Sequence, residues 1–339
     1  MKAIMVIFVY INNMQTNGEI KHSIKTFMNK MVDYAGIFPP ASLNLAQAFH
    51  NFIFYSQGEY KWMLSKFIIP AARLPELSEI MKEMTIEGVV PFSIICSGGK
   101  DLEEFKRNLE ADNKNIVDFR NAHGTKVLTD VFEMRLPKNI FEHDSADEVE
   151  RTLEYISNLF RTSVKDKFCN YYEATFGEDY NATIINLAEA IAHHNKRGNS
   201  GGFKLRTGGT EAVAFPTAEQ VAFAIMTCCE FCVPMKCTAG LHHPIRHFNE
   251  VMSADMHGFI NVFGAGILAY TNDLDEGEIL EVLNEQDPFA FKFDEDGFVW
   301  EDFIASNTEV KKAREKFIIS YGSCSFDEPI DDLKMLELL

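Results

Sequence analysis

Two short segments each carry a lysine in a stretch typical of a β-strand end. Lys204 lies in Phe-Lys-Leu-Arg-Thr-Gly-Gly at 203–209, and Lys236 lies in Met-Lys-Cys-Thr-Ala-Gly at 235–240. Each lysine stands four residues before a glycine. An unprotonated lysine amine is a nucleophile toward carbonyl carbons. We therefore expect these segments to be neighbouring strands that carry chemistry.

Alternate residues of a strand point to the same face, so each lysine has predictable neighbours on its own face. Arg206 shares the face of Lys204, and Thr238 shares the face of Lys236. A third strand-like segment carries Glu173 in the same phase. The pattern predicts that one carboxylate and two amines share a layer.

Two lysines on adjacent strands repel each other, which favours the neutral form of one of them. A neutral lysine can form a Schiff base with a carbonyl substrate. The alternative is a structural network, in which Glu173 pairs with the lysines and Arg206 closes the set of charges. Both interpretations place the same residues together.

From about residue 30 onward, short apolar segments alternate with amphipathic helical segments, a pattern typical of a parallel α/β sheet. Eight such rounds in about 250 residues match a (β/α)8 barrel. An open doubly wound sheet is the alternative, although no Gly-x-Gly-x-x-Gly follows an early strand. The expected strands are 32–38, 63–69, 89–96, 126–136 together with 116–119, 168–176, the two lysine segments, and 258–266.

The eighth of these strands is ambiguous, because the apolar residues of 258–266 also fit a helical period. With that strand, the (β/α)8 TIM barrel spans 31–285. Residues 1–30 form an N-terminal extension, and residues 286–339 form a C-terminal extension packed on the barrel.

Catalytic groups of such barrels lie at the carboxyl ends of the strands, where both lysines and Glu173 are expected. Lys-x-x-Thr-Gly from Lys204, followed about thirty residues later by Val-x-x-Lys-x-x-x-Gly through Lys236, resembles class I aldolases of the deoxyribose-phosphate aldolase type. The resemblance covers 203–241. It implies a (β/α)8 barrel in which Lys204 forms the Schiff base and Lys236 lowers its pKa.

The whole chain also resembles bacterial proteins that share the segments 33–40, 239–244 and 322–329, a likeness that implies no activity. Arg206 and the His242-His243-Pro244 segment differ from the aldolase pattern, which points to a different substrate.

Polar residues near the expected strand ends are the candidate substrate ligands. Tyr34 could donate a proton, and Asp33 could orient a lysine. The glycines Gly240, Gly264 and Gly266 could offer backbone N–H groups to a phosphate. The predicted substrate-binding residues are Tyr34, Arg206, Thr207, Thr238, His242, His243 and Asn261.

A metal site is the alternative to lysine chemistry. It would use Glu133, Glu173 and His242, with His257 as a further ligand, and such mixed oxygen and nitrogen donors suit zinc or manganese. The lysine interpretation needs no metal and no cofactor.

Composition narrows the classes of partner. The net charge of −18 argues against binding to nucleic acid or to an anionic membrane surface. No apolar run is long enough to predict a membrane span, and the run at 1–11 lacks the cleavage site of a secretory signal. The seven cysteines show no regular pairing, which favours reduced thiols in a cytoplasmic protein.

The sequence thus favours a cytoplasmic carbon–carbon lyase that acts through a lysine Schiff base on a small anionic carbonyl substrate. A homo-oligomer is compatible with this interpretation. The alternatives are a metal-dependent hydrolase or isomerase on the same barrel, and a non-catalytic binding or scaffold protein.

Overall fold

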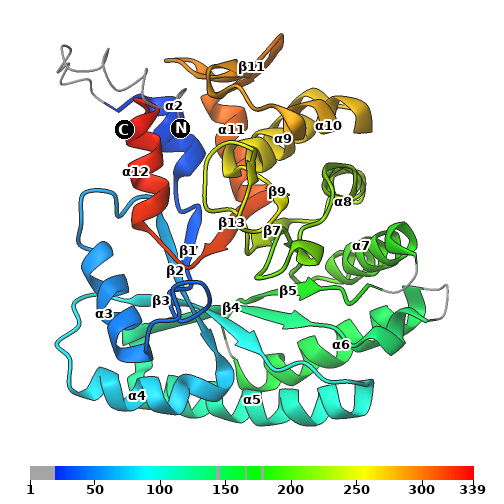
Figure 1. The fold of residues 1–339 in the computed structure, drawn as a ribbon. Helices are drawn as coiled ribbons and strands as arrows, with labels where there is room; N and C mark the ends of the chain where they lie inside the picture. Colours follow the sequence, from blue (N-terminus) through cyan, green and yellow to red (C-terminus); the bar gives the residue numbers. More distant parts are fainter. Residues whose placement is uncertain (1–19, 143–145, 165, 177–178) are drawn as a thin grey trace.

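The computed structural model describes residues 20–142, 146–164, 166–176 and 179–339. The apolar run at 1–11 and most of the expected N-terminal extension lie outside these residues. Eight parallel strands close into a barrel, and helices surround it, which confirms the predicted (β/α)8 TIM barrel (Figure 1). The strands, in their order around the barrel, are β1 (Val32–Tyr34), β13 (Ile318–Ser323), β7 (Met235–Thr238), β6 (Gly201–Arg206), β5 (Cys169–Glu173), β4 (Val127–Arg135), β3 (Val90–Cys96) and β2 (Leu64–Pro70).

Helix starts follow the local capping chemistry of the sequence. Thr217 caps α8 in a capping box with Gln220, and Ser306 caps α11 in the same way with Glu309. The helices are α2 (His22–Met28), α3 (Leu45–Tyr55), α4 (Leu74–Lys82), α5 (Leu102–His123), α6 (Ala146–Ser163), α7 (Tyr180–Lys196), α8 (Ala218–Glu230), α9 (Phe259–Asn272), α10 (Glu276–Asn284), α11 (Asn307–Lys316) and α12 (Asp327–Met335).

The eighth barrel strand is β13, and the prediction of a strand at 258–266 is wrong. That segment belongs to α9, a 14-residue helix whose residues from Phe259 to Ala269 are all buried. A helix that is apolar on every side satisfies the strand pattern and the helix pattern equally well. The barrel is therefore closed by a strand from the segment that we expected to be a C-terminal extension.

Two small sheets interrupt the regular alternation. A hairpin of β8 (His247–Asn249) and β9 (Ala254–Met256) follows β7, and a three-stranded antiparallel sheet separates α10 from α11. The three strands are β10 (Phe291–Phe293), β11 (Gly297–Trp300) and β12 (Phe303–Ser306).

The fourth barrel strand is β4 alone, and the prediction that 116–119 contributes to it is wrong. Ile116 and Phe119 continue the buried stripe of α5, which also contains Phe105 and Leu109. Spacings of three and four residues place these side chains on one helical face, which packs on the barrel.

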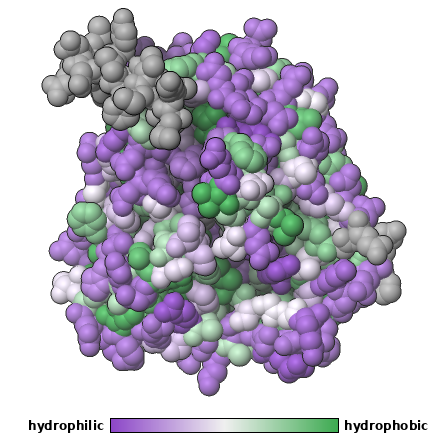
Figure 2. All heavy atoms as spheres, in the orientation of Figure 1, coloured by the Kyte–Doolittle hydropathy of each residue, from purple (hydrophilic) through white to green (hydrophobic). Residues whose placement is uncertain are grey.

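The stretch from Ala212 to Glu230 meets the length and hydropathy of a membrane-crossing helix, contrary to the expectation from the sequence. In the structure its helical part, α8, packs between α7 and α10 in the outer ring. Buried helices of globular proteins meet the same criterion, so this finding is weak support for a membrane span. Hydrophilic side chains dominate the face of the molecule in Figure 2, and hydrophobic residues gather near its centre.

Candidate active site

Lys204 and Lys236 face each other across neighbouring strands. Strands β6 and β7 pair in parallel, and Lys204 is the direct register partner of Lys236. Both side chains are buried, with 5% and 1% of their surface exposed. The prediction that the two lysines share one layer of the barrel is confirmed.

Three buried carboxylates contact these two ammonium groups. Lys204 Nζ lies 3.0 Å from Glu133 Oε2 and 3.1 Å from Glu173 Oε2. Lys236 Nζ lies 2.8 Å from Asp33 Oδ2 and also contacts Glu133 Oε1. Glu133 on β4 therefore bridges the two lysines.

Arg206 completes an alternating row of charges across the barrel. Its Nε lies 3.1 Å from Glu173 Oε1, and 44% of its side chain is exposed. We call this row the charge chain, with the members Asp33, Lys236, Glu133, Lys204, Glu173 and Arg206. Its formal charges sum to zero.

Hydroxyl groups fix the carboxylates of the charge chain. Ser93 on β3 donates to Glu133 Oε1 at 2.5 Å, and Ser320 on β13 donates to Asp33 Oδ2 at 2.6 Å. The backbone N–H of Lys66 donates to Asp33 Oδ1 at 3.0 Å. Hydrogen bonds and ion pairs together hold these buried carboxylates in a fixed orientation.

The carboxylates hold both lysines in the charged form. Burial alone would lower the pKa of Lys236, but Asp33 and Glu133 outweigh it and raise that pKa above its ordinary value. Burial would also lower the pKa of Lys204, but the carboxylates of Glu133 and Glu173 outweigh this effect and raise that pKa. The expectation that repulsion leaves one lysine neutral is therefore wrong for the resting protein, because Glu133 lies between the two amines.

The same contacts keep the carboxylates ionised. Burial would raise the pKa of Glu133, but Lys236 and Lys204 lower it well below its ordinary value. Lys204 and Arg206 do the same for Glu173. The Lys204 amine and the carboxylates of Glu133 and Glu173, within 3.1 Å of each other, therefore rest as oppositely charged pairs.

A cavity of about 220 Å³ opens at the carboxyl ends of the strands. Lys204 reaches it, whereas Lys236 is not among its lining residues. Arg206 and His242 also line it, and its described lining contains no Asp or Glu. The remaining lining residues are Ala35, Phe38, Pro39, Pro40, Ile68, Ile95, Gly209, Thr210, Thr238, Ala239, Gly240, Gly322 and Cys324.

Several predicted substrate ligands have structural contacts instead. Thr207 is fully buried, and its Oγ1 donates to the carbonyl of Ala239 at 2.5 Å, which joins the ends of β6 and β7. Tyr34 packs against Tyr55 and Phe67 and is absent from the cavity lining.

Asn261 and two of the glycines also have packing roles. Asn261 lies in α9, where its Oδ1 accepts from the N–H of Arg246 and its Nδ2 donates to the carbonyls of Val282 and Glu285. Gly264 and Gly266 are in the same helix, where an added Cβ would meet Phe298 and Ile318 respectively. Of the expected phosphate glycines, only Gly240 borders the cavity.

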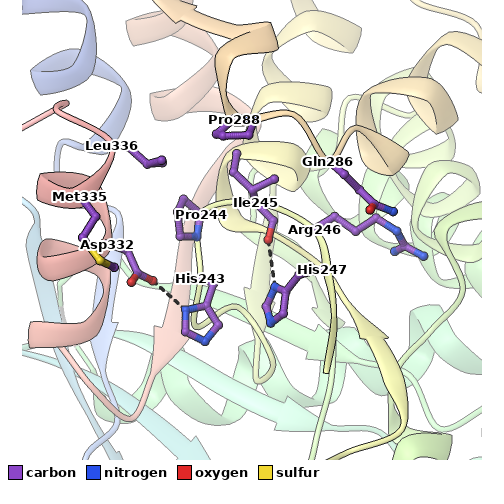
Figure 3. Close-up of a pocket in the computed structure, with 10 residues that line it drawn as sticks. All are labelled: His243, Pro244, Ile245, Arg246, His247, Gln286, Pro288, Asp332, Met335 and Leu336. Atoms are coloured by element: carbon purple, nitrogen blue, oxygen red, sulfur yellow. Dashed lines mark hydrogen bonds and ion pairs between the residues drawn. The ribbon is translucent and has the colours of Figure 1, made fainter. Parts of the chain in front are cut away.

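The two adjacent histidines face different cavities. His242 lines the barrel mouth, and its Nδ1 lies 3.2 Å from Glu328 Oε2. His243 lines a separate cavity beside α12 (Figure 3). Both residues lie in the loop after β7, and the chain bends from His243 onward.

The alternative metal site is not assembled in the described part of the chain. Within those residues, no group of three or more His, Cys, Asp or Glu side chains is arranged to hold a metal ion. Glu133 and Glu173 are committed to lysines, and His242 pairs with Glu328. His257 donates instead to the carbonyl of Pro216 at 2.8 Å.

Two members of the site carry weaker sequence signals than the lysines. The sequence pattern indicated Glu133 only as a metal ligand, although a single glutamate inside an otherwise buried strand segment signals a buried partner. Asp33 was expected to orient a lysine, and it contacts Lys236. Ser93 and Ser320 carry no signal of their own, because serine is frequent in any strand.

Comparisons with protein-family models, with curated proteins and with solved structures found no match to this chain. The fold and the site describe a (β/α)8 barrel with a buried charge chain next to an open mouth that Lys204, Arg206 and His242 line.

Proposed function

We propose that the barrel mouth is the active site of a carbon–carbon lyase that acts through a Schiff base on Lys204. The observation that carries this proposal is the position of Lys204, which lines the cavity while two carboxylates lie within 3.1 Å of its amine. The proposed substrate is a small carbonyl compound with an anionic group.

The first step is a proton transfer within the site. Lys204 rests as an ammonium ion, so it gives one proton to Glu173 before it can react. Its lone pair then adds to the substrate carbonyl, and loss of water leaves a protonated imine. The carboxylic acid formed in the first step supplies a proton to the departing oxygen.

The protonated imine then accepts electrons from the substrate. Deprotonation of a hydroxyl group on the carbon β to the imine, with a carboxylate as base, breaks the bond between the α and β carbons. The released electron pair forms an enamine on Lys204, and the β carbon leaves as a carbonyl product. Reprotonation of the enamine and addition of water return the amine and the second product.

The remaining residues of the site bind the substrate and control the charges around Lys204. Arg206 and His242 line the cavity and can attract the anionic group of the substrate, although each also pairs with a glutamate outside the lining. Lys236 lies beside Lys204 on the neighbouring strand and keeps Glu133 ionised and fixed. It acts on Lys204 through Glu133 rather than by direct contact.

Reductive trapping tests this function. The protein is incubated with small 2-oxo acids and with phosphorylated or carboxylated aldehydes, reduced with borohydride, and analysed by peptide mass spectrometry. We expect a reduced adduct on Lys204 and none on Lys236. Absence of any adduct on Lys204 across the panel would contradict the proposal.

Lys204→Arg is the matched control. Arginine keeps the positive charge between Glu133 and Glu173 but forms no Schiff base, so the fold should persist while trapping and turnover disappear. Turnover that survives in Lys204→Arg would instead favour a scaffold role for the charge chain.

A further inference from the structure

A second cavity of about 380 Å³ lies outside the barrel mouth, beside α12. Three separate stretches of the chain line it: the loop after β7, residues 286–288, and the C-terminal part of α12 (Figure 3). Its walls are largely apolar, and its polar side chains include two histidines from the loop. The lining residues are His243, Pro244, Ile245, Arg246, His247, Gln286, Pro288, Asp332, Met335 and Leu336.

Each of the two imidazoles forms a hydrogen bond through its Nδ1 atom. His243 Nδ1 lies 2.7 Å from Asp332 Oδ2, and His247 Nδ1 lies 3.0 Å from the carbonyl of Ile245. The rings pack edge to face, with centroids 4.8 Å apart. Among the hydrogen bonds of the described residues, none uses the Nε2 atom of either ring. Both Nε2 atoms are therefore left for a ligand.

His243 can present a hydrogen-bond donor to an anion in this cavity, which the carboxylate of its partner Asp332 also lines. The hydrogen bond with Asp332 raises the pKa of His243, and Glu328 on the same helix acts in the same direction. The protonated ring keeps a donor on Nε2. The other charged or titratable groups nearby on the loop are His247 and Arg246, and Arg246 pairs with Asp255 at 3.3 Å.

The backbone that carries the histidines is fixed in place. The N–H groups of Phe259 and Ile260, at the start of α9, donate at 2.9 Å to the carbonyls of His243 and Pro244. The N–H of Arg246 donates to Asn261 Oδ1 at 2.8 Å. A ligand that binds here loses little free energy to ordering of the protein.

We propose that this cavity binds an amphiphilic oxyanion, a carboxylate or phosphate head group on an apolar body. The head group accepts hydrogen bonds from the Nε2 atoms of His243 and His247. The apolar body lies against Ile245, Pro288 and Leu336, with Met335 at the edge. A metal ion fits less well, because the described residues offer no set of three donors here. This site goes beyond the proposed lyase chemistry and does not depend on it.

Calorimetric titration of the full chain with octanoate and with octyl phosphate tests the proposal, at about pH 6 and pH 8. Acetate, inorganic phosphate and octanol separate the contribution of the head group from that of the chain. We expect octanoate and octyl phosphate to bind more tightly at the lower pH, because protonated His243 keeps a hydrogen-bond donor on Nε2. Affinity should rise by up to about fourfold per added methylene group from acetate to octanoate.

Two variants locate the binding. His243→Gln should weaken octanoate binding by about tenfold, whereas His50→Gln, at an exposed histidine of α3 that lines neither cavity, should leave it unchanged. Met335→Glu places a negative charge at the cavity edge on a side chain that is 71% exposed, so it should weaken binding without unfolding the protein. Octanol that binds as tightly as octanoate, octanoate binding that His243→Gln and Met335→Glu leave intact, or no binding at millimolar concentrations would each overturn the proposal.

Discussion

Glu133 is the residue on which the charge chain depends. It pairs with Lys204 through one oxygen and with Lys236 through the other, and it is fully buried. Without it, two buried ammonium groups would face each other with nothing between them. Removal of one partner from a buried ion pair costs far more than the pair contributes in net terms, since the remaining charge stays desolvated.

We therefore predict that Glu133→Gln lowers the free energy of unfolding by about 3 kcal/mol or more. Ser93→Ala is the milder comparison, because it removes a hydrogen bond to Glu133 but leaves every charge paired, and it should cost about 1–2 kcal/mol. Urea denaturation at neutral pH measures both values. If both variants lost the same free energy of unfolding, the two lysine charges would not depend on Glu133 for their compensation.

At the scale of elements, the site depends on how the ends of β6 and β7 meet. Gly240 has a φ of 78°, and an added Cβ would lie 2.7 Å from the carbonyl oxygen of Thr207. This close approach brings Lys204 and the loop after β7 to the same cavity. A glycine is required here by both backbone conformation and space.

Gly240→Ala should be destabilised by about 2 kcal/mol more than Gly88→Ala. Gly88 has the same φ of 78°, but a Cβ added there would meet no atom within 4 Å beyond its chain neighbours, so that variant bears the conformational cost alone. Thermal or urea denaturation of the pair provides the measurement. If both variants lose the same free energy of unfolding, the close contact between the ends of β6 and β7 is not the reason that glycine is required at position 240.

At the scale of the whole molecule, the barrel is closed by strand β13, which is separated from β7 by two small sheets and by the helices α9, α10 and α11. Strand β13 pairs with β7 on one side and with β1 on the other. It also supplies Ser320, which donates to Asp33. The C-terminal part of the chain is therefore part of the barrel.

A chain that ends after residue 285 should fail to fold cooperatively. It would lack β13, leaving β1 and β7 as open edges around a buried charge chain. Far-ultraviolet circular dichroism and urea denaturation of the truncated protein, beside the full chain, test this expectation. A sharp unfolding transition in the truncated protein would mean that the first seven strands are stable without β13.

The charge chain also sets a pH window for stability. The pKa values of Glu133 and Glu173 are lowered from 4.5, so their contribution is present above that pH and is lost as the pH falls through the folded values. The pKa values of Lys204 and Lys236 are raised from 10.5, so their contribution is present below that pH and is lost as the pH rises through the folded values.

We expect the free energy of unfolding to vary little between about pH 5 and pH 10 and to fall on both sides. Urea midpoints measured across this range test the profile, and Glu133→Gln should show a shallower acidic limb. An acidic limb of unchanged slope in that variant would assign the acid sensitivity to other carboxylates.

Local sequence patterns predicted much of the fold and part of the candidate site. Strand periodicity placed Lys204 and Lys236 on one face, and the observed register makes them direct partners. Capping residues such as Thr217 marked helix starts, and the alternation of elements predicted the barrel. These features are local, because a few neighbouring residues decide backbone conformation and side-chain direction.

Only the tertiary structure decided which segment closes the barrel and which carboxylates reach the lysines. The segment 258–266 is apolar on every side, so its own residues could not distinguish strand from helix. Glu133 and Asp33 lie far from the lysines in sequence, and only barrel closure brings them within ion-pair distance. The charge state of the lysines followed from those distant contacts, because the pKa of a buried amine depends on the charges around it and not on its spacing in the chain.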